Sequence, residues 1–245
     1  MNISYFILIF ILSLFQSIFG IGLLALGTPL LLLNNFSFEQ TLSILLPCSM
    51  LVSIITLFFA RGKFKESLDY EFIKNFFIFC LPSVMLGFLF IFLFQLHINL
   101  KLMIGFLILI SVILSLSISN KIFPIINSNK KIINFIIGFI HGISNVGGAF
   151  LSNYLLILNK NEKIKTRIQI AFAYFFFGFT QYFFLQFLLN NFKNLNNIYT
   201  LLLIATLGVI AGNGMQKYFK NIIFKYIING SITISALFLI FKSLN

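Results

Sequence analysis

Residues 138–156 read GFIHGISNVGGAFLSNYLL, a run that combines glycines with side chains able to donate or accept hydrogen bonds. A helix surrounded by lipid satisfies its backbone groups internally and has no need for clustered Gly, His, Asn and Ser. Glycines let a ligand approach the backbone, and the N–H groups at a helix start favour an anion. The chemistry that this combination favours is the binding of a small anion.

The rest of the chain sets the environment in which that run must act. Of its 245 residues, 60% are hydrophobic and only 9% are charged, which predicts a polytopic membrane protein with no soluble domain. The first apolar run begins at Ile3 with no basic region before it, so we expect a retained membrane segment. The net charge of +12 is spread over short loops, where it orients the protein in the bilayer, and it does not indicate nucleic-acid binding.

The chain resembles itself at a shift of 125 positions. The shift superposes three pairs of glycines and one pair of threonines, and it places the polar Gln16 on His141. The matching pairs are Gly22 with Gly147, Gly87 with Gly212, Gly105 with Gly230, and Thr41 with Thr166. We therefore predict an all-α membrane protein built from two transmembrane repeats, residues 1–120 and 126–245, in one integral membrane domain.

Each predicted repeat contains the same order of apolar segments. A long one interrupted by glycines and polar residues comes first, at 3–33 and at 132–158. Three plainer segments follow in each repeat, at 41–60, 72–96 and 100–119, then at 168–189, 198–216 and 222–242. A spanning helix needs about 20 residues. The plain segments fit one crossing each, whereas the interrupted ones are too long for one crossing and short for two.

The distribution of basic residues favours interrupted segments that make no net crossing. If each crossed once, Lys and Arg would divide almost evenly between the two sides, contrary to the usual bias. If neither makes a net crossing, only Lys101, Lys193 and Lys242 of the 17 basic residues lie opposite the others. The repeats are then inverted relative to each other, with basic loops in the cytoplasm and both termini outside. Either a re-entrant hairpin or two short tilted spans satisfies this arrangement.

Inverted repeats with helices broken at matching positions are a recurring design of secondary transporters. The two breaks fall within 16–29 and 141–153, and we expect their helix starts to converge on one anion. The predicted substrate-binding residues are Gln16, Gly20, Gly22, Thr28, His141, Ser144, Asn145, Gly147, Gly148 and Asn153. Close helix packing is the alternative for glycines such as Gly138 and Gly142. Hydrogen bonds to neighbouring helices are the alternative for Ser144, Asn145, Ser152 and Asn153.

His141 is the ionisable group that we place inside the membrane. It could stay neutral and bond a backbone carbonyl, or it could contact substrate or carry a proton. All five acids lie in predicted loops, so no buried carboxylate is expected to bind a cation, although neutral oxygens leave sodium coupling open. Cys48 and Cys80 lie in apolar segments and are expected to pack rather than form a disulfide or bind a metal. We predict no cofactor.

An intramembrane enzyme would need an HExxH motif, paired aspartates or an activated nucleophile. The chain has no HExxH and no aspartate pair in its apolar segments, and Ser144 lacks a GxSxG setting. We therefore expect no enzyme. A structural or assembly subunit without transport of its own is a further alternative.

At its glycine-rich stretches the chain resembles the TauE/SafE sulfite exporter family. The stretches are GIGLLALGTPLLLL (20–33) and GISNVGGAFLSNYLL (142–156), and KIKTRIQIAFAYF (163–175) is similar to the family's next helix. The NVGG stretch is the closer match, because the first stretch lacks the usual run of glycines. The resemblance implies a multi-pass protein of a bacterial inner membrane that moves sulfite or organosulfonates.

Together these patterns predict a secondary transporter of small anions that works by alternating access in the lipid bilayer. The alternatives are a passive anion channel and a transporter of other small carboxylates. The predicted partners are the anion and the bilayer, and a homo-oligomer is left open.

Overall fold

A computed structural model of the chain describes residues 3–94, 99–117, 128–159, 162–189, 197–218 and 221–244. Within these ranges every regular element is a helix, which confirms the all-α prediction. The α-helices are α1 (Ile3–Phe19), α2 (Gly27–Leu33), α3 (Phe38–Phe59), α4 (Phe64–Ser67), α5 (Tyr70–Asn75), α6 (Leu81–Phe94), α7 (Leu100–Ser117), α9 (Lys130–Ser144), α10 (Gly147–Leu158), α11 (Lys163–Leu189), α12 (Ile198–Met215) and α13 (Asn221–Leu244). Short 3₁₀ turns occupy Arg61–Lys63 and Gln216–Tyr218.

Four stretches of the described chain are long and apolar enough to cross a membrane. They are Phe38–Phe59, Tyr70–Phe94, Lys163–Phe187 and Ile198–Met215. Large apolar side chains remain exposed on the outside of the bundle, including Leu93 at 74% and Phe187 at 73%. Lipid, unlike water, imposes no penalty on such a surface, so its extent fits a protein embedded in a bilayer.

Local sequence explains where these helices begin and bend. Ser37 caps α3 through a reciprocal pair of bonds with Gln40, which fixes the turn after α2. A π-helical turn at Phe76–Cys80 joins α5 to α6 just before Pro82. Because proline has no N–H to donate back along the helix, the regular pattern cannot continue through it, and a local change of pitch accommodates it.

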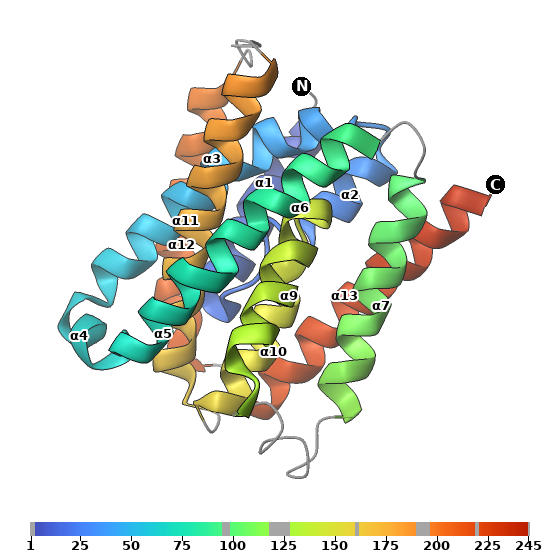
Figure 1. The fold of residues 1–245 in the computed structure, drawn as a ribbon. Coiled ribbons are helices and arrows are strands. Elements are labelled where there is room, and N and C mark those ends of the chain that lie inside the picture. Colours follow the sequence, from blue (N-terminus) through green and yellow to red (C-terminus); the bar gives the residue numbers. More distant parts are fainter. Residues whose placement is uncertain are drawn as a thin grey trace.

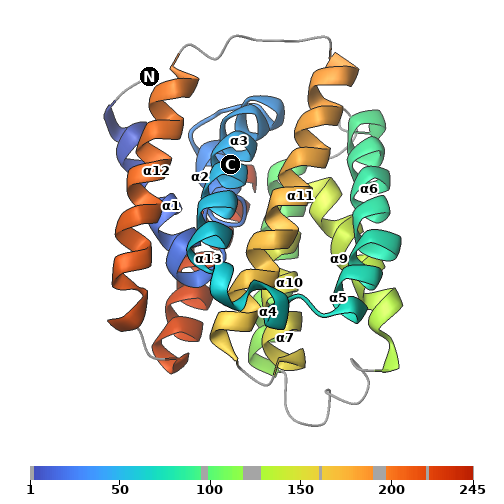
Figure 2. The ribbon, with the colours of Figure 1, turned by 90° about the vertical axis from the view of Figure 1, so that its left-hand side faces the viewer.

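Both interrupted segments are broken helices, as predicted from the sequence. α1 and α2 together occupy 3–33, and α9 and α10 occupy 130–158. In each pair the second helix turns back towards the end of the bundle at which the first began (Figure 1, Figure 2). At 1.5 Å per residue, α2 is about 10 Å long and α10 about 18 Å, well short of the ~30 Å hydrocarbon core. These lengths favour re-entrant hairpins over pairs of full spans.

Close helix packing depends on glycines at two equivalent crossings, α6 with α9 and α12 with α1. A Cβ added at Gly87 would lie 2.3 Å from the carbonyl oxygen of Phe139 and 3.2 Å from the Cα of Gly142. A Cβ added at Gly212 would lie 2.8 Å from the carbonyl oxygen of Leu14. Gly212 and Phe139 lie 125 positions after Gly87 and Leu14, so the two crossings use matching residues. The other main pairs are α3 with α11 and α7 with α13.

A glycine–serine contact also occurs at both crossings, but the helix that supplies the glycine and the helix that supplies the serine are exchanged. A Cβ at Gly138 of α9 would meet the Cys80 carbonyl oxygen and the Ser83 Oγ, both at 2.1 Å. A Cβ at Gly208 of α12 would lie 2.8 Å from the Cβ of Ser13 on α1. Shifting by 125 positions converts Ser13 into Gly138 and Ser83 into Gly208. Gly138 and Gly142 therefore serve helix packing.

Among the described residues, the two ends of the bundle differ in charge, as the sequence predicts. Both chain termini lie towards the same end of the bundle (Figure 1), near the first turn of α7 and the last turn of α13, which carry Lys101 and Lys242. Lys121, Lys160, Lys193 and Lys220 lie outside the described residues. We expected Arg167 to lie in a loop, but α11 begins at Lys163 and includes Arg167, of which only 8% is exposed.

These glycine contacts give a first prediction. Gly87→Ala should lower the free energy of unfolding by about 1–3 kcal/mol, because the added methyl group meets backbone that cannot move aside cheaply. Gly230→Ala is the matched control, since no atom lies within 4 Å of a Cβ added there. Thermal unfolding in detergent measures both variants. Equal melting temperatures for the two would contradict the close packing of α6 on α9.

Candidate functional site

The two broken helices meet at a hydrogen bond between the predicted repeats. The Asn145 Nδ2 donates to the Thr28 Oγ1 at 2.9 Å, across 117 residues of sequence. Both side chains are completely buried. The structure thus brings the first glycine-rich stretch against the second.

The side-chain amide of Gln16 makes hydrogen bonds across the first break. Its Oε1 accepts from the backbone N–H of Leu23 at 3.3 Å, and its Nε2 donates to the Ser49 Oγ at 3.0 Å and the Ser53 Oγ at 3.3 Å. The chain leaves α1 at Gly20, whose φ of +78° is a conformation that glycine adopts readily. Gln16 therefore satisfies backbone in the break and fastens it to α3.

The start of α2 also has its N–H groups satisfied by the chain itself. The Gly27 N–H bonds the carbonyl oxygen of Gly22 at 3.2 Å, and the Thr28 N–H bonds that of Leu24 at 3.3 Å. A Cβ at Gly22 would lie 2.6 Å from the Gln16 nitrogen, so this glycine allows the turn to fold against α1. These N–H groups point at protein, whereas the sequence led us to expect them to face an anion.

The second break is sharper, and it is built on a left-handed residue. Asn145 has a φ of +60°, and its N–H bonds the His141 carbonyl oxygen at 2.7 Å to end α9. α10 begins at Gly147 two residues later. A Cβ at Gly147 would meet the His141 backbone at 2.6 Å, and one at Gly148 would lie 1.8 Å from the Tyr174 Oη. Both glycines therefore leave room for groups that crowd the start of α10.

His141 lies beside this helix start with no hydrogen bond to its ring. The residue is fully buried, and neither the Nδ1 nor the Nε2 has a partner among the described residues. The ring stacks on Phe177 with centroids 4.1 Å apart, and the Tyr174 ring is 6.3 Å away. Among the described residues, no backbone carbonyl accepts a hydrogen bond from the His141 ring.

Three further buried polar atoms without partners surround the second break. They are the Asn145 Oδ1, the Tyr174 Oη and the Gln181 Oε1. Gln181 is held there because its Nε2 donates to the His141 carbonyl oxygen at 3.4 Å. An unsatisfied buried polar group costs about 1–3 kcal/mol, so a cluster of them calls for a ligand or water. We call His141, Asn145, Tyr174 and Gln181 the central polar cluster.

The sequence analysis missed Tyr174 and Gln181. Both lie on α11, within a stretch that we treated as a plain spanning segment. They are seven residues apart, with Phe177 between them at the third position, so the three share one face of the helix. That spacing of polar residues in an otherwise phenylalanine-rich helix is the signal that could have identified them.

Two of the predicted residues donate hydrogen bonds to backbone carbonyl oxygens of the protein. The Ser144 Oγ donates to the Ile140 carbonyl oxygen at 2.5 Å, within α9. The Asn153 Nδ2 donates to the Ser111 carbonyl oxygen at 3.3 Å, which links α10 to α7. Asn153 lies two turns along α10 from its start, apart from the central polar cluster.

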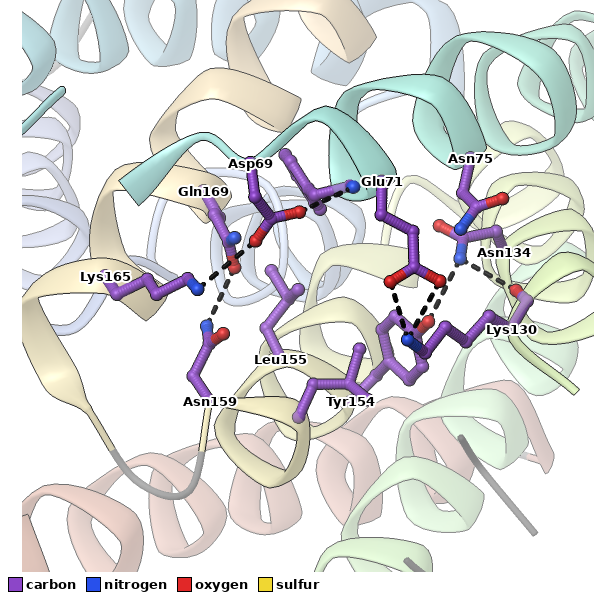
Figure 3. Close-up of a pocket in the computed structure, with 12 residues that line it drawn as sticks. Asp69, Glu71, Asn75, Lys130, Asn134, Tyr154, Leu155, Asn159, Lys165 and Gln169 are labelled. Atoms are coloured by element: carbon purple, nitrogen blue, oxygen red, sulfur yellow. Dashed lines mark hydrogen bonds and ion pairs between the residues drawn. The ribbon is translucent and has the colours of Figure 1, made fainter. Parts of the chain in front are cut away.

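A polar pocket of about 130 Å³ lies near the other end of α10, where α5, α9 and α11 converge (Figure 3). Lys130 pairs with Glu71 at 2.9 Å and Lys165 pairs with Asp69 at 3.2 Å (Figure 3). The Asn134 Nδ2 donates to the Tyr154 Oη at 3.1 Å deeper in the pocket. With two cations and two carboxylates in its lining, this pocket has no excess charge with which to select an anion.

A helical bundle with two broken helices around an enclosed polar cluster is the architecture of a membrane transporter. The sequence profile of the family Sulfite exporter TauE/SafE matches residues 5–239, and the chain belongs to this family. It is therefore a multi-pass membrane protein of a transporter family, not of an enzyme family, and membership implies export of sulfur-containing anions. A search of curated proteins and a search of solved structures each gave no match.

Gln16 and His141 occupy matching positions in the two breaks, and we expect their replacement to affect the free energy of unfolding differently. Gln16→Leu should lower the free energy of unfolding by about 1–3 kcal/mol, because it leaves the Leu23 N–H without its buried acceptor. His141→Leu should leave the free energy of unfolding unchanged or raise it, because no hydrogen bond to the ring is lost. Thermal unfolding without added anion compares the two variants. A greater loss for His141→Leu than for Gln16→Leu would show that the His141 ring holds the fold together.

Proposed function

We propose that the protein is a secondary transporter that carries sulfite or a small organosulfonate across the membrane by alternating access. One observation carries the proposal beyond family membership. The Asn145–Thr28 bond joins the two broken helices directly beside the unsatisfied atoms of the central polar cluster. Such atoms are the ones a bound polar substrate would satisfy.

In this proposal the second break supplies most of the binding groups. The N–H groups of Gly147 and Gly148 stand at the start of α10, where the helix offers them no acceptor and its dipole is positive. They would hold the negatively charged oxygens of the anion. The Tyr174 hydroxyl and a neutral His141 ring would donate further hydrogen bonds. Binding without a full positive charge would leave the anion free enough to be released.

We further propose that residues 1–120 and 126–245 are inverted repeats that move against each other. Support comes from the glycine contacts at the two crossings, which match at a shift of 125 positions. It also comes from the directions of the helices, because α3 and α11 run oppositely along the bundle (Figure 2). The basic end would face the cytoplasm and both termini would lie outside.

The burial of the central polar cluster favours alternating access over a passive channel. Thr28, His141, Asn145 and Tyr174 have no exposed surface, so an anion can reach them only after helices move. Tyr154 in the wall of the polar pocket lies seven residues, or about 10 Å, along α10 from the start of that helix. The pocket marks one direction from which such an opening could begin.

Transport by purified protein in proteoliposomes tests the proposal. Uptake of radiolabelled sulfite should saturate, should be inhibited by organosulfonates, and should exchange with unlabelled sulfite trapped inside. Dependence on an imposed pH gradient would identify proton coupling. Inhibition by small carboxylates but not by organosulfonates would indicate a carboxylate transporter instead. Uptake that never saturates would indicate a channel.

Tyr174→Phe provides a sharp test of the binding groups, because it removes one unpartnered hydroxyl and no described hydrogen bond. The loss of a hydrogen bond to a charged ligand predicts a decrease of about tenfold in sulfite transport at low concentration, with unchanged thermal stability in the absence of anion. Tyr182→Phe on the same helix is the matched control and should transport normally. Equal transport by both variants would remove Tyr174 from the site.

A further inference from the structure

A cavity of about 390 Å³ lies at the end of the bundle where α3 and α12 finish and α11 begins. It is separate from the central polar cluster. Arg167 in its wall precedes Phe177, the stacking partner of His141, by ten residues of α11, or about 15 Å. The described residues that line the cavity are Phe59, Ala60, Gly62, Lys63, Ile164, Arg167, Asn213 and Gln216.

Arg167 is a buried cation that no carboxylate neutralises. Its two terminal nitrogens donate to the neutral side-chain oxygens of Asn213 and Gln216. All five acids of the chain are among the described residues, and their two ion pairs involve Lys130 and Lys165. A buried charge without a counter-charge is unfavourable. An anion in this cavity would remove that imbalance.

The cavity also offers hydrogen-bond donors that no described residue uses. The Arg167 Nε and the Asn213 Nδ2 are both buried without a partner among the described residues. Lys63 adds a third donor, from the 3₁₀ turn after α3. Guanidinium, amide and ammonium donors around one cavity are the groups that bind oxyanions in proteins.

The charge of this cavity distinguishes it from its neighbours. No acid is among the described residues that line it, whereas Lys63 and Arg167 both carry a positive charge. The adjoining cavity has Lys63, Lys163 and Lys165 in its lining, but Glu66 and Glu162 offset two of these three charges. In the polar pocket of Figure 3, Asp69 and Glu71 offset both lysines. An anion reaching this end of the bundle would therefore favour the Arg167 cavity.

We propose that the Arg167 cavity is a second anion site, which binds a tetrahedral oxyanion group such as sulfate or phosphate. The exposed side chains of Phe59 and Ile164 at its wall would also accept the upper part of a lipid tail. The oxyanion could therefore be free in solution or be the phosphate of an anionic lipid headgroup. In either case Arg167, Lys63 and Asn213 supply the contacts.

Thermal unfolding of the purified full-length protein tests this site with two probes. Sodium sulfate, compared with sodium chloride at equal ionic strength, tests a free oxyanion. Short-chain phosphatidylglycerol, compared with phosphatidylcholine, tests a lipid phosphate. A saturable rise in melting temperature with either probe, which the Asn213→Asp variant below removes, supports the site and identifies the source, and no rise with either probe overturns it.

Two variants assign the effect to this cavity without removing Arg167, whose loss could prevent folding. Lys63→Gln should weaken binding of the effective probe by about fivefold, the scale of an exposed charge contact, whereas Lys65→Gln two residues away should not. Asn213→Asp would give Arg167 a carboxylate partner. It should raise the melting temperature without anion and abolish the response to the probe. A full response in Asn213→Asp, or equal weakening in Lys63→Gln and Lys65→Gln, would overturn the proposal.

Discussion

Backbone polar groups exposed by a broken helix must find partners inside the protein, because lipid offers none. Two helices of the apolar bundle are broken, and the two breaks differ in how their polar groups are satisfied. The first break is satisfied by Gln16 and by bonds from Gly27 and Thr28 back to the preceding turn. The second ends α9 on a left-handed Asn145 and leaves polar atoms around His141 unpartnered. The first break is thus bonded to the bundle, whereas the second has polar atoms without partners among the described residues, which is why we propose it as the binding site.

Helix packing explains how such breaks can lie at the centre of the molecule. Gly87 and Gly212 let α6 and α12 approach the first helix of each broken pair at backbone contact. One side of each of these helices is thereby covered by protein, and the two breaks meet at the Asn145–Thr28 bond. Movement of either hairpin would disturb that bond and the central polar cluster together.

The sequence was sufficient to predict the helices, both breaks and the contact between them. The length of an apolar segment and the glycines that interrupt it are local signals. It could not predict which polar side chains are satisfied. Gln16 and His141 occupy matching positions, yet only the structure shows that the first is fully bonded and the second is not. Tyr174 was hidden in an aromatic-rich helix, because its role depends on Gly148, far along the chain. Arg167 resembled a loop cation, because its burial depends on the end of α12.

Access to the second break from both sides of the membrane is the central requirement of this mechanism. It can be measured with Ser144→Cys in a protein whose buried free cysteines, Cys48 and Cys80, are replaced by alanine. A membrane-impermeant thiol reagent is applied to either face of oriented proteoliposomes, with and without sulfite. Alternating access predicts slow labelling from each face and a clear decrease in labelling rate when sulfite is bound. Labelling from one face only, or at a rate that sulfite does not change, would contradict a transport site at this break.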